Sequence, residues 1–187
     1  MPTSAKVSAA KPRVAGAIYR APKGTTLPTD AKTALANTYK ELGFVSEDGV
    51  TNSNESESEN IKAWGGQVVL VTSSEKSDSF KFSLIESLNL DVLKTVYGDS
   101  NVTQATGTNG MITVNVNANA IPEAVYVIDI AMNDNMLKRI VIPAGNLGEL
   151  GDVVYKDDEA VAYEVTINCM PDASGNNHYE YIEVAST

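Results

Sequence analysis

The chain of 187 residues contains one cysteine, Cys169, and one histidine, His178. A single cysteine excludes an intrachain disulfide and a thiolate zinc cluster, and a single histidine excludes a metal site built from paired imidazoles. A hydrolytic triad or a Cys/His dyad would have to use His178 as its base. We expect Cys169 to pack as a small apolar side chain and His178 to be solvated in the polar turn DASGNNH.

Basic residues are also scarce, because 14 Lys and Arg stand against 24 Asp and Glu and give a formal net charge of -10. This balance argues against an ordinary nucleic-acid binder, which needs clustered cations to neutralise phosphates. No apolar run approaches the length of a membrane span, and the first residues lack the apolar core of a secretory signal. We therefore expect a soluble protein, made in the cytoplasm, with no membrane partner.

The motifs of common enzymes and ligand sites are missing. Gly24-Thr25-Thr26-Leu27 lacks the later Gly-Lys-Ser/Thr of a phosphate-binding loop. Asp157-Asp158-Glu159 lacks the every-second-residue spacing of a calcium loop, which favours a surface turn. We predict no enzymatic activity, no catalytic residue, no cofactor and no metal.

Alternation of apolar and polar residues dominates the rest of the chain. It predicts roughly ten short strands, hence a mainly β fold, either a β-sandwich or a half-barrel. One short flanking α-helix is expected over Leu88 to Tyr97, where Asn89 caps the start and Gly98 ends it. Residues 14–187 form a single domain in this prediction, and residues 1–13 form a flexible N-terminal arm.

The segment 47–66 is predicted to project from this domain. Asp48-Gly49 is a strong hairpin-turn signal, and the arm that follows it, VTNSNESES, has no apolar face to bury. Two further strands are expected at 67–72 and 79–86, around the polar turn SSEKSD. Trp64 with Gly65 and Gly66 suits either a ligand-stacking platform or an anchor onto a neighbouring surface, and the second is favoured because no other ligand-binding group accompanies them.

Charge is distributed unevenly along the chain. Residues 1–24 hold five basic side chains and no acid, whereas residues 47–59 hold five acids and no base. These runs are either solvated faces or surfaces of opposite sign that meet on neighbouring copies in a heterologous contact. The second interpretation makes the following residues inter-subunit candidates: Lys6, Lys11, Arg13, Glu47, Asp48, Glu55, Glu57, Glu59, Trp64, Gly65 and Gly66.

Three stretches resemble a known family. They are GAIYRAPKGTTLPTDAKTAL, ELGFVSEDGVTNSNESESENIKAWGGQVV and FKFSLIESLNLDVLKTVYGDSNV. They are similar to the major tail tube proteins of long, noncontractile-tailed (siphovirus-type) bacteriophages, in particular those of Gram-positive hosts. The combination of GFVSEDGV with a downstream IKAWGG carries most of this resemblance.

The resemblance implies a structural protein of the virion tail. Copies would form hexameric rings that stack into a tube, with inner strands joined into one β-barrel around the path of the genome. Its partners would be other copies of itself, the tape measure protein, the tail terminator and the tail tip proteins. The inner strands are expected within 67–86 and 111–133, with Thr113, Asn115 and Asn117 as lumen-facing candidates. An acidic lumen would let DNA pass without sticking, because DNA carries about one charge per 1.7 Å.

Two other functions remain open at this point. A monomeric β-sandwich that binds a receptor or carbohydrate would need an exposed aromatic site, for which Trp64 is the lone candidate. A different ring-forming tail component, such as a terminator or neck protein, would give single rings in place of filaments.

Overall fold

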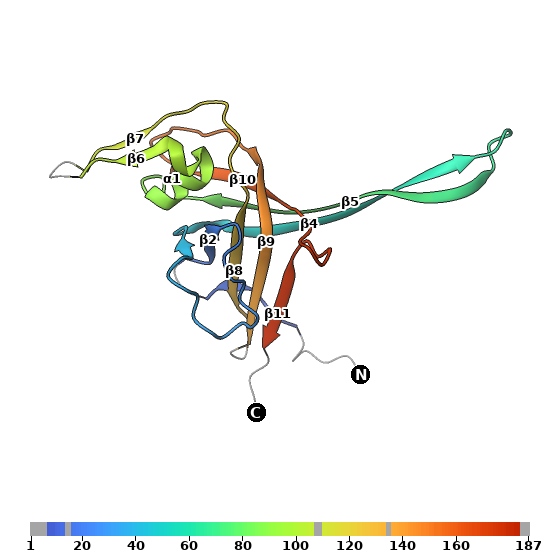
Figure 1. The fold of residues 1–187 in the computed structure, drawn as a ribbon, viewed down its shortest axis with the longest axis horizontal. Helices are drawn as coiled ribbons and strands as arrows, with labels where there is room; N and C mark the ends of the chain where they lie inside the picture. The colour runs from blue at the N-terminus through green and yellow to red at the C-terminus, as the bar shows by residue number, and fades with distance from the viewer. Residues whose placement is uncertain (1–6, 14–15, 107–109, 134–135, 184–187) are drawn as a thin grey trace.

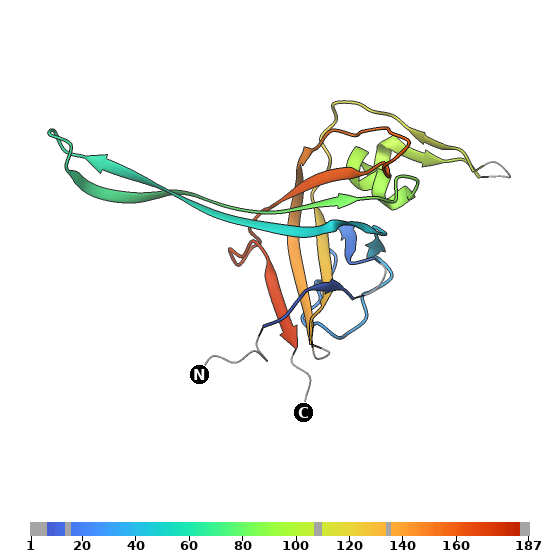
Figure 2. The same ribbon diagram turned by 180° about the vertical axis from the view of Figure 1, so that it is seen from behind.

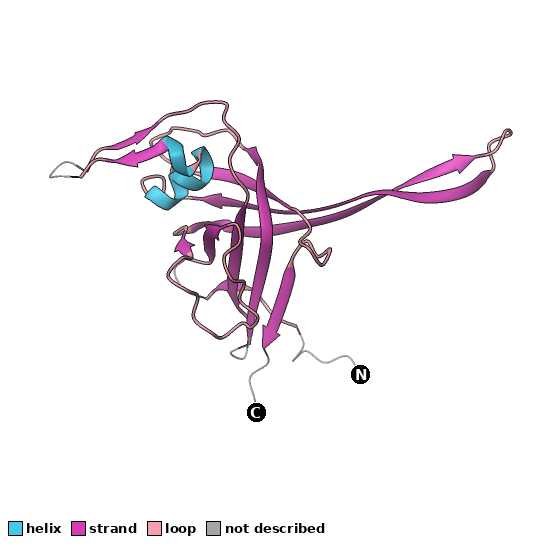
Figure 3. Cartoon of the chain, in the orientation of Figure 1, coloured by secondary structure: helices cyan, strands magenta, loops and turns pink. Residues whose placement is uncertain are grey.

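A computed structural model of the chain describes residues 7–13, 16–106, 110–133 and 136–183 (Figure 1). The described part is mainly β with one α-helix, which confirms the predicted fold class (Figure 3). The strands are β1 (Lys11–Pro12), β2 (Ile18–Pro22), β3 (Lys40–Glu41), β4 (Val45–Lys62), β5 (Val68–Leu84), β6 (Val102–Gln104), β7 (Ile112–Val114), β8 (Ala124–Ala131), β9 (Leu137–Leu150), β10 (Tyr163–Cys169) and β11 (Tyr179–Glu183).

A large antiparallel sheet of nine strands forms the body, and its central strands change partners along their length. The main path runs β3-β2-β8-β9-β10-β5-β4. One edge of β9 pairs with β11 through residues 137–141 and then with β10 through residues 145–150. Likewise, one edge of β8 pairs with β2 and then with β1. These changes of partner split the sheet into the two layers of a sandwich-like body.

The body is packed on both faces of β8, whose first six residues are all buried. Tyr126 and Ile128 belong to the main core, together with Phe80, Phe82 and the helix. Val125 and Val127 point to the opposite face, where Tyr39 and other residues of the segment between β2 and β3 cover them. A strand that is buried on both faces does not need to alternate apolar and polar residues, and the β8 sequence AVYVIDIA shows no such alternation.

The predicted helix is confirmed as α1 (Leu90–Tyr97), and a 3-10 turn, Asp99–Asn101, follows it. The side chain of Asn89 accepts a hydrogen bond from the backbone N–H of Asp91 at the start of the helix. Gly98 ends it with φ of 93°, and its N–H donates to the carbonyl of Lys94. Val92, Leu93 and Val96 pack into the main core, as the spacing of three to four residues predicts.

In the sequence, Val161, Tyr163, Val165, Ile167 and Cys169 alternate with other residues, which predicts a strand with one buried face. Strand β10 confirms it, because Tyr163, Val165, Ile167 and Cys169 are buried at every second position. Apolar and polar residues alternate from Ile112 through Ala118, which predicts one strand over this whole range. This predicted strand is too long, since β7 ends at Val114 and the side chain of Val116 is exposed. In addition, β7 pairs with β6 in a separate small sheet beside α1. Asn133-Asp134-Asn135, which the sequence predicts to be a hairpin turn, lies partly outside the described residues.

Two predictions about the segment 39–86 are wrong. Asp48-Gly49 is not a hairpin turn but part of a bulge in β4, where Val45 pairs with Leu84 and Val50 with Phe82. The stretch SSEKSD is not a turn either, because β5 runs through it without interruption. A glycine with positive φ serves a bulge as well as a turn, so the dipeptide alone does not separate the two.

Candidate assembly interface

The most distinctive feature is a two-stranded ribbon, here called the hairpin, formed by β4 and β5 and extending far from the body (Figures 1 and 2). Only Ser79–Leu84 of β5 pair with β10, so Val68–Asp78 pair with β4 alone. At about 3.3 Å per residue, these residues carry the hairpin roughly 35 Å past the sheet. It contains the segment 47–66 that was predicted to project, together with a return strand that was not predicted to do so.

The turn at the end of the hairpin is built on Gly65 and Gly66. The N–H of Gly66 donates to the carbonyl of Ala63 at 2.9 Å, and the N–H of Ala63 donates to the carbonyl of Gln67 at 2.8 Å. Gly65 and Gly66 have φ of 110° and 90°, values that residues with a Cβ rarely adopt. The turn therefore presents the Trp64 side chain to solvent, where it is fully exposed.

Large apolar side chains gather around this turn on residues 61–71, here called the tip. The exposed apolar residues of the tip are Ile61, Trp64, Val68, Val69, Leu70 and Val71. Their exposed fractions lie between 45% for Ile61 and 108% for Trp64, so the body covers none of them fully. Successive residues of β5 point to opposite faces of the ribbon, so apolar side chains are exposed on both faces of the tip. A concentration of exposed apolar side chains of this kind marks a candidate interaction surface. The sequence predicts Trp64 as an anchor but indicates only an ordinary strand for the four aliphatic residues of β5.

Between tip and body, the hairpin is polar. Its β4 strand reads TNSNESES, and Glu55 and Glu59 are exposed, as are Glu47 and Asp48 in the bulge near the body. The side chains of Glu57 and Lys6 lie outside what the structure describes. Bulges between the pairs of Glu57 and Ser58 and between those of Ile61 and Lys62 increase the twist of the ribbon. The hairpin thus holds an apolar tip away from the body on an acidic and polar connection.

A buried carboxylate fixes the point where the hairpin leaves the body. Asp78 accepts a hydrogen bond from Asn52 Nδ2 at 2.8 Å and one from His178 Nδ1 at 2.5 Å. The His178 ring also packs edge-on against Phe80, with centroids 5.2 Å apart, and its side chain is only 16% exposed. The prediction of a solvated His178 is therefore wrong, because the turn before β11 folds back onto β5. Asp78, Asn52 and His178 are here called the base clamp.

The described part of the N-terminal segment lies along the body. Lys11 and Pro12 form β1 and pair with Ala131 and Ile130 of β8. Arg13 donates to the carbonyl of Ala31 at 2.8 Å and lies 3.6 Å from the carboxylate of Asp129. That carboxylate also binds the buried Arg139 through two hydrogen bonds of 2.6 and 2.8 Å. Arg13 thus has partners within its own subunit, whereas the Lys11 side chain is exposed.

The lumen-facing candidates lie in or just after β7. Thr113, Asn115 and Asn117 are all exposed. Thr113 pairs with Thr103 of β6, and the N–H of Asn115 donates to the carbonyl of Asn101 at 2.8 Å. Asn117 Nδ2 donates to Asn101 Oδ1 at 2.9 Å. Strand β7 lies beside α1, on the side of the body opposite the tip (Figure 1).

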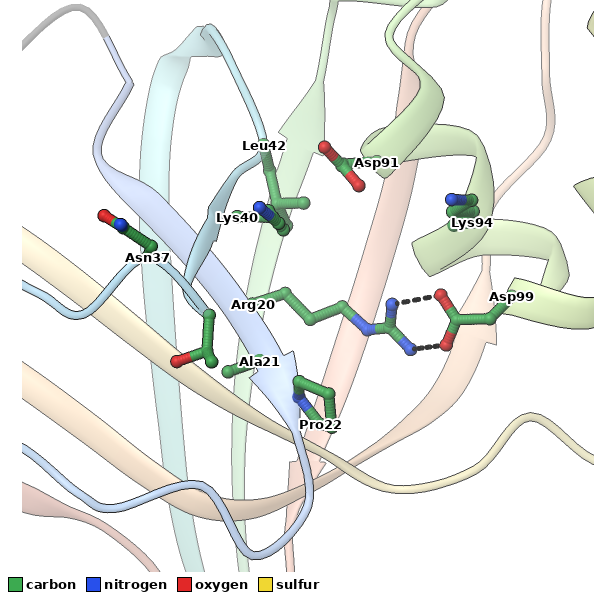
Figure 4. A pocket seen from close by; sticks show the side chains of 10 residues that line it. Arg20, Ala21, Pro22, Asn37, Lys40, Leu42, Asp91, Lys94 and Asp99 are labelled. Atoms are coloured by element: carbon green, nitrogen blue, oxygen red, sulfur yellow. Dashed lines mark hydrogen bonds and ion pairs between the residues drawn. The ribbon is translucent and has the colours of Figure 1, made fainter. Parts of the chain in front are cut away.

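A cavity of about 500 Å³ between β2, β3 and α1 contains the most conspicuous group of charged side chains (Figure 4). Arg20 donates two hydrogen bonds, of 2.9 and 2.8 Å, to the two carboxylate oxygens of Asp99. This bidentate contact holds the pKa of Asp99 below its usual value. Lys40 and Lys94 line the same cavity. The arrangement fastens β2 to the turn after the helix and pairs no nucleophile with a base.

The remaining reactive groups are also structural. Cys169 is buried, as predicted, and burial together with the nearby charge of Asp78 raises the pKa of its thiol to about 12. Within the described ranges, no cluster of three or more His, Cys, Asp or Glu side chains has the arrangement of a metal site. No helix of the described residues is long and apolar enough to cross a bilayer.

Comparison with known proteins agrees with an assembly surface. Residues 7–186 match a family model described as phage tail tube protein. The match covers the body, the hairpin and the described part of the N-terminal segment. A search of curated protein sequences gives no match.

Proposed function

Because this chain belongs to the phage tail tube protein family, we propose that its copies form hexameric rings which stack into the tube of a virion tail and surround the path of the genome. The observation that carries the proposal is the hairpin with its exposed apolar tip. A monomeric function gives no reason to hold six apolar side chains in water at the end of a polar ribbon. Contact with another copy would bury these side chains and so gives a reason for their exposure in the subunit.

The energetics favour an assembly with many contacts over a simple dimer. Burying the exposed parts of six apolar side chains stabilises a contact by on the order of 5–10 kcal/mol. Association costs about 4–15 kcal/mol in lost translational and rotational freedom, so one tip contact leaves little or no net affinity. A ring or stack repeats the contact around a closed structure, and each further contact is then made within an already joined assembly. We expect monomers at low concentration and cooperative tube formation above a threshold.

Open strand edges provide a second route for joining copies. Among the described strands, β4 is the last of the large sheet, and β5 pairs with β4 alone along Val68–Asp78. Unpaired backbone N–H and C=O groups on such edges pair readily with strands of another chain. In this proposal, edge pairing joins neighbouring subunits, and the tip makes a heterologous contact with another copy.

The charge of -10 suits a channel that DNA passes without binding. A basic lumen would hold the duplex through many counterion-releasing contacts. We place the polar face of Thr113, Asn115 and Asn117 at the lumen, and we assign the exposed Lys11, Glu47 and Asp48 to contacts between copies. A map of the assembled tube with a predominantly basic lumen would contradict this part of the proposal.

The family resemblance extends the proposal to other tail proteins. The tape measure protein would occupy the lumen during assembly, and tail tip and terminator proteins would cover the two ends. We propose the long, noncontractile type of tail for this chain, as the resemblance implies, and a Gram-positive host for the phage that carries it.

Assembly of purified protein tests the proposed function. Negative-stain microscopy and sedimentation should show tubes for the wild type at high concentration. We expect Trp64→Ser to raise the concentration needed for assembly by tenfold or more, because it removes the largest exposed apolar group of the tip. Tyr155→Ser is the matched control, since Tyr155 is an exposed aromatic residue outside the hairpin.

Other outcomes would favour the remaining functions. A wild-type protein that stays monomeric at every concentration would favour the receptor- or carbohydrate-binding module. Single rings that never stack would favour a terminator or neck protein. Equal assembly by Trp64→Ser and the wild type would show that Trp64 of the tip does not contribute to the interface.

A further inference from the structure

An apolar groove of about 420 Å³ lies on the body where the hairpin begins. Its walls are the described start of the chain, the bulged beginning of β4 and strand β8. Its apolar lining residues include Pro12, Phe44, Val50 and Ile130, and the charged Lys11 and Glu47 also line it. We call it the base groove. The Phe44 side chain at its opening is 51% exposed, although the residues on either side of the groove belong to the packed body.

The backbone of Phe44 is held by two hydrogen bonds. Its N–H donates to Glu86 Oε1 at 3.0 Å, and its carbonyl accepts from the N–H of Ile85 at 3.1 Å. Gly43 before it has φ of 70°, and a Cβ there would lie 2.1 Å from the Glu86 carboxyl carbon. The backbone that carries the exposed Phe44 ring is therefore positioned by contacts with Ile85 and Glu86.

We propose that the base groove receives the tip of the hairpin from a second copy of this chain. The proposal rests on the function proposed above and names the surface that the tip contacts. Both halves of the contact are apolar, and no residue that the structure describes covers either one: the tip at Ile61–Val71 and the groove around Phe44. The groove has room for an aromatic side chain or for two aliphatic ones, which is what the tip offers in Trp64 and in the pair Val69 and Val71 on one face of β5.

A subunit cannot fill its own groove with its own tip. The tip lies roughly 35 Å beyond the body along a continuous ribbon, whereas the groove lies beside the first residues of that ribbon. The occupant must therefore come from another copy. Each copy then offers one tip and one groove on different surfaces, which is the heterologous arrangement that generates rings or stacks.

Charge complements this contact and sets its orientation. Lys62 is the only charged residue from Asn60 to Thr72. The groove has Glu47 and Asp48 on the β4 side and Lys11 on the β1 side. Glu47 and Asp48 attract Lys62 of the incoming tip and Lys11 repels it, so both effects turn Lys62 toward the acidic β4 side. Burial of the apolar side chains supplies the affinity, and these exposed charges supply direction.

Disulfide trapping between two variants, each with one introduced cysteine, tests the contact. Val69→Cys places a thiol on the tip, and Ser46→Cys places one at the groove. The native Cys169 gives little background because it is buried and its thiol has a pKa of about 12. The two variants are mixed, assembled and then oxidised, so any cross-link between them joins different copies. We expect a dimer band from this mixture and none when Val154→Cys, an exposed position elsewhere on the body, replaces Ser46→Cys.

A second pair of variants tests the groove without a cross-link. Phe44→Ser should raise the concentration needed for assembly by about tenfold or more, whereas Phe44→Leu, which keeps an apolar wall, should restore most of the assembly. Circular dichroism and the unfolding free energy of each variant show whether the body is intact. Assembly by Phe44→Ser at the wild-type concentration, with the body intact, would overturn the proposal.

The outcomes separate this inference from the proposed function. Wild-type tubes in which Val69→Cys never cross-links to Ser46→Cys would overturn the base groove and leave the tube function standing. Cross-linking of Val69→Cys only to itself would replace tip-to-groove contact with tip-to-tip contact. A wild-type protein that never assembles would contradict both.

Discussion

Replacing His178 by alanine should destabilise the subunit and loosen the hairpin where it joins the body. His178 Nδ1 donates to the buried Asp78 carboxylate at 2.5 Å, and its ring packs edge-on against Phe80. A hydrogen bond to a charged group contributes about 1.5–3 kcal/mol, and an edge-on aromatic pair about 0.5–1.5 kcal/mol. Asp78 keeps its bond from Asn52 in the variant. We therefore expect the free energy of unfolding to fall by about 2–4 kcal/mol.

Two measurements distinguish this effect from a general loss of stability. Urea unfolding followed by circular dichroism gives the change in free energy, and Asn177→Ala in the same turn is the control, with an expected change within about 0.5 kcal/mol. Hydrogen exchange should show faster exchange of the β4 and β5 amides near Asn52 and Asp78 than of those in β8. A loss below about 0.5 kcal/mol for His178→Ala, or unchanged exchange at the hairpin base, would refute the clamp.

Two further predictions concern alkaline pH and the N-terminal segment. Burial raises the pKa of Cys169 from 9.0 to about 12, so the contribution of the neutral thiol to stability is fully present below pH 9 and is lost as the pH rises toward 12. Unfolding curves from pH 8 to 11 should show a decline in the free energy of unfolding, and Cys169→Ala should reduce that decline. An equal decline in both proteins would contradict the prediction. Deleting residues 1–12 removes the exposed Lys11 together with Lys6, and should weaken tube stacking most at low salt, where the Debye length is long. Sedimentation of both forms across salt concentrations checks this, and salt-independent assembly by both would count against an electrostatic role.

The sequence predicts best those elements whose local pattern and tertiary environment agree. Asn89 and Gly98 bound the helix because capping is a local interaction of the backbone ends with nearby groups. Val165, Ile167 and Cys169 alternate because β10 has one buried face. In both cases the side chains that set the pattern are also the ones that pack.

The hairpin was harder to predict because its stability comes from cross-strand pairing and not from burial. TNSNESES has the composition of a loop, yet it forms a strand because β5 supplies a partner along its length. Asp48-Gly49 and Gly65-Gly66 both offer backbone with positive φ, and only the pairing register shows that the first is a bulge and the second the turn.

Contacts between distant segments were the least predictable part of the site. The base clamp joins Asp78 to His178, 100 residues later, and no local pattern links the two. The base groove likewise combines β1, β4 and β8. An exposed Phe44 after a glycine was the one available signal for it, and that signal has no meaning until the fold places the ring beside β8.

The length of the hairpin makes it a lever. With its tip roughly 35 Å from the body, a rotation of about 5° at the base moves the tip by about 3 Å, close to the rise per residue along a strand. The hydrogen bonds among Asn52, Asp78 and His178 therefore lie where they would limit rotation of the hairpin relative to the body. In an assembled tube, small and distributed rotations at these pivots would let the filament curve while every tip remained seated. The contacts at the base of the hairpin would then determine how stiffly the tail resists bending, and the contacts at the tip would hold its subunits together.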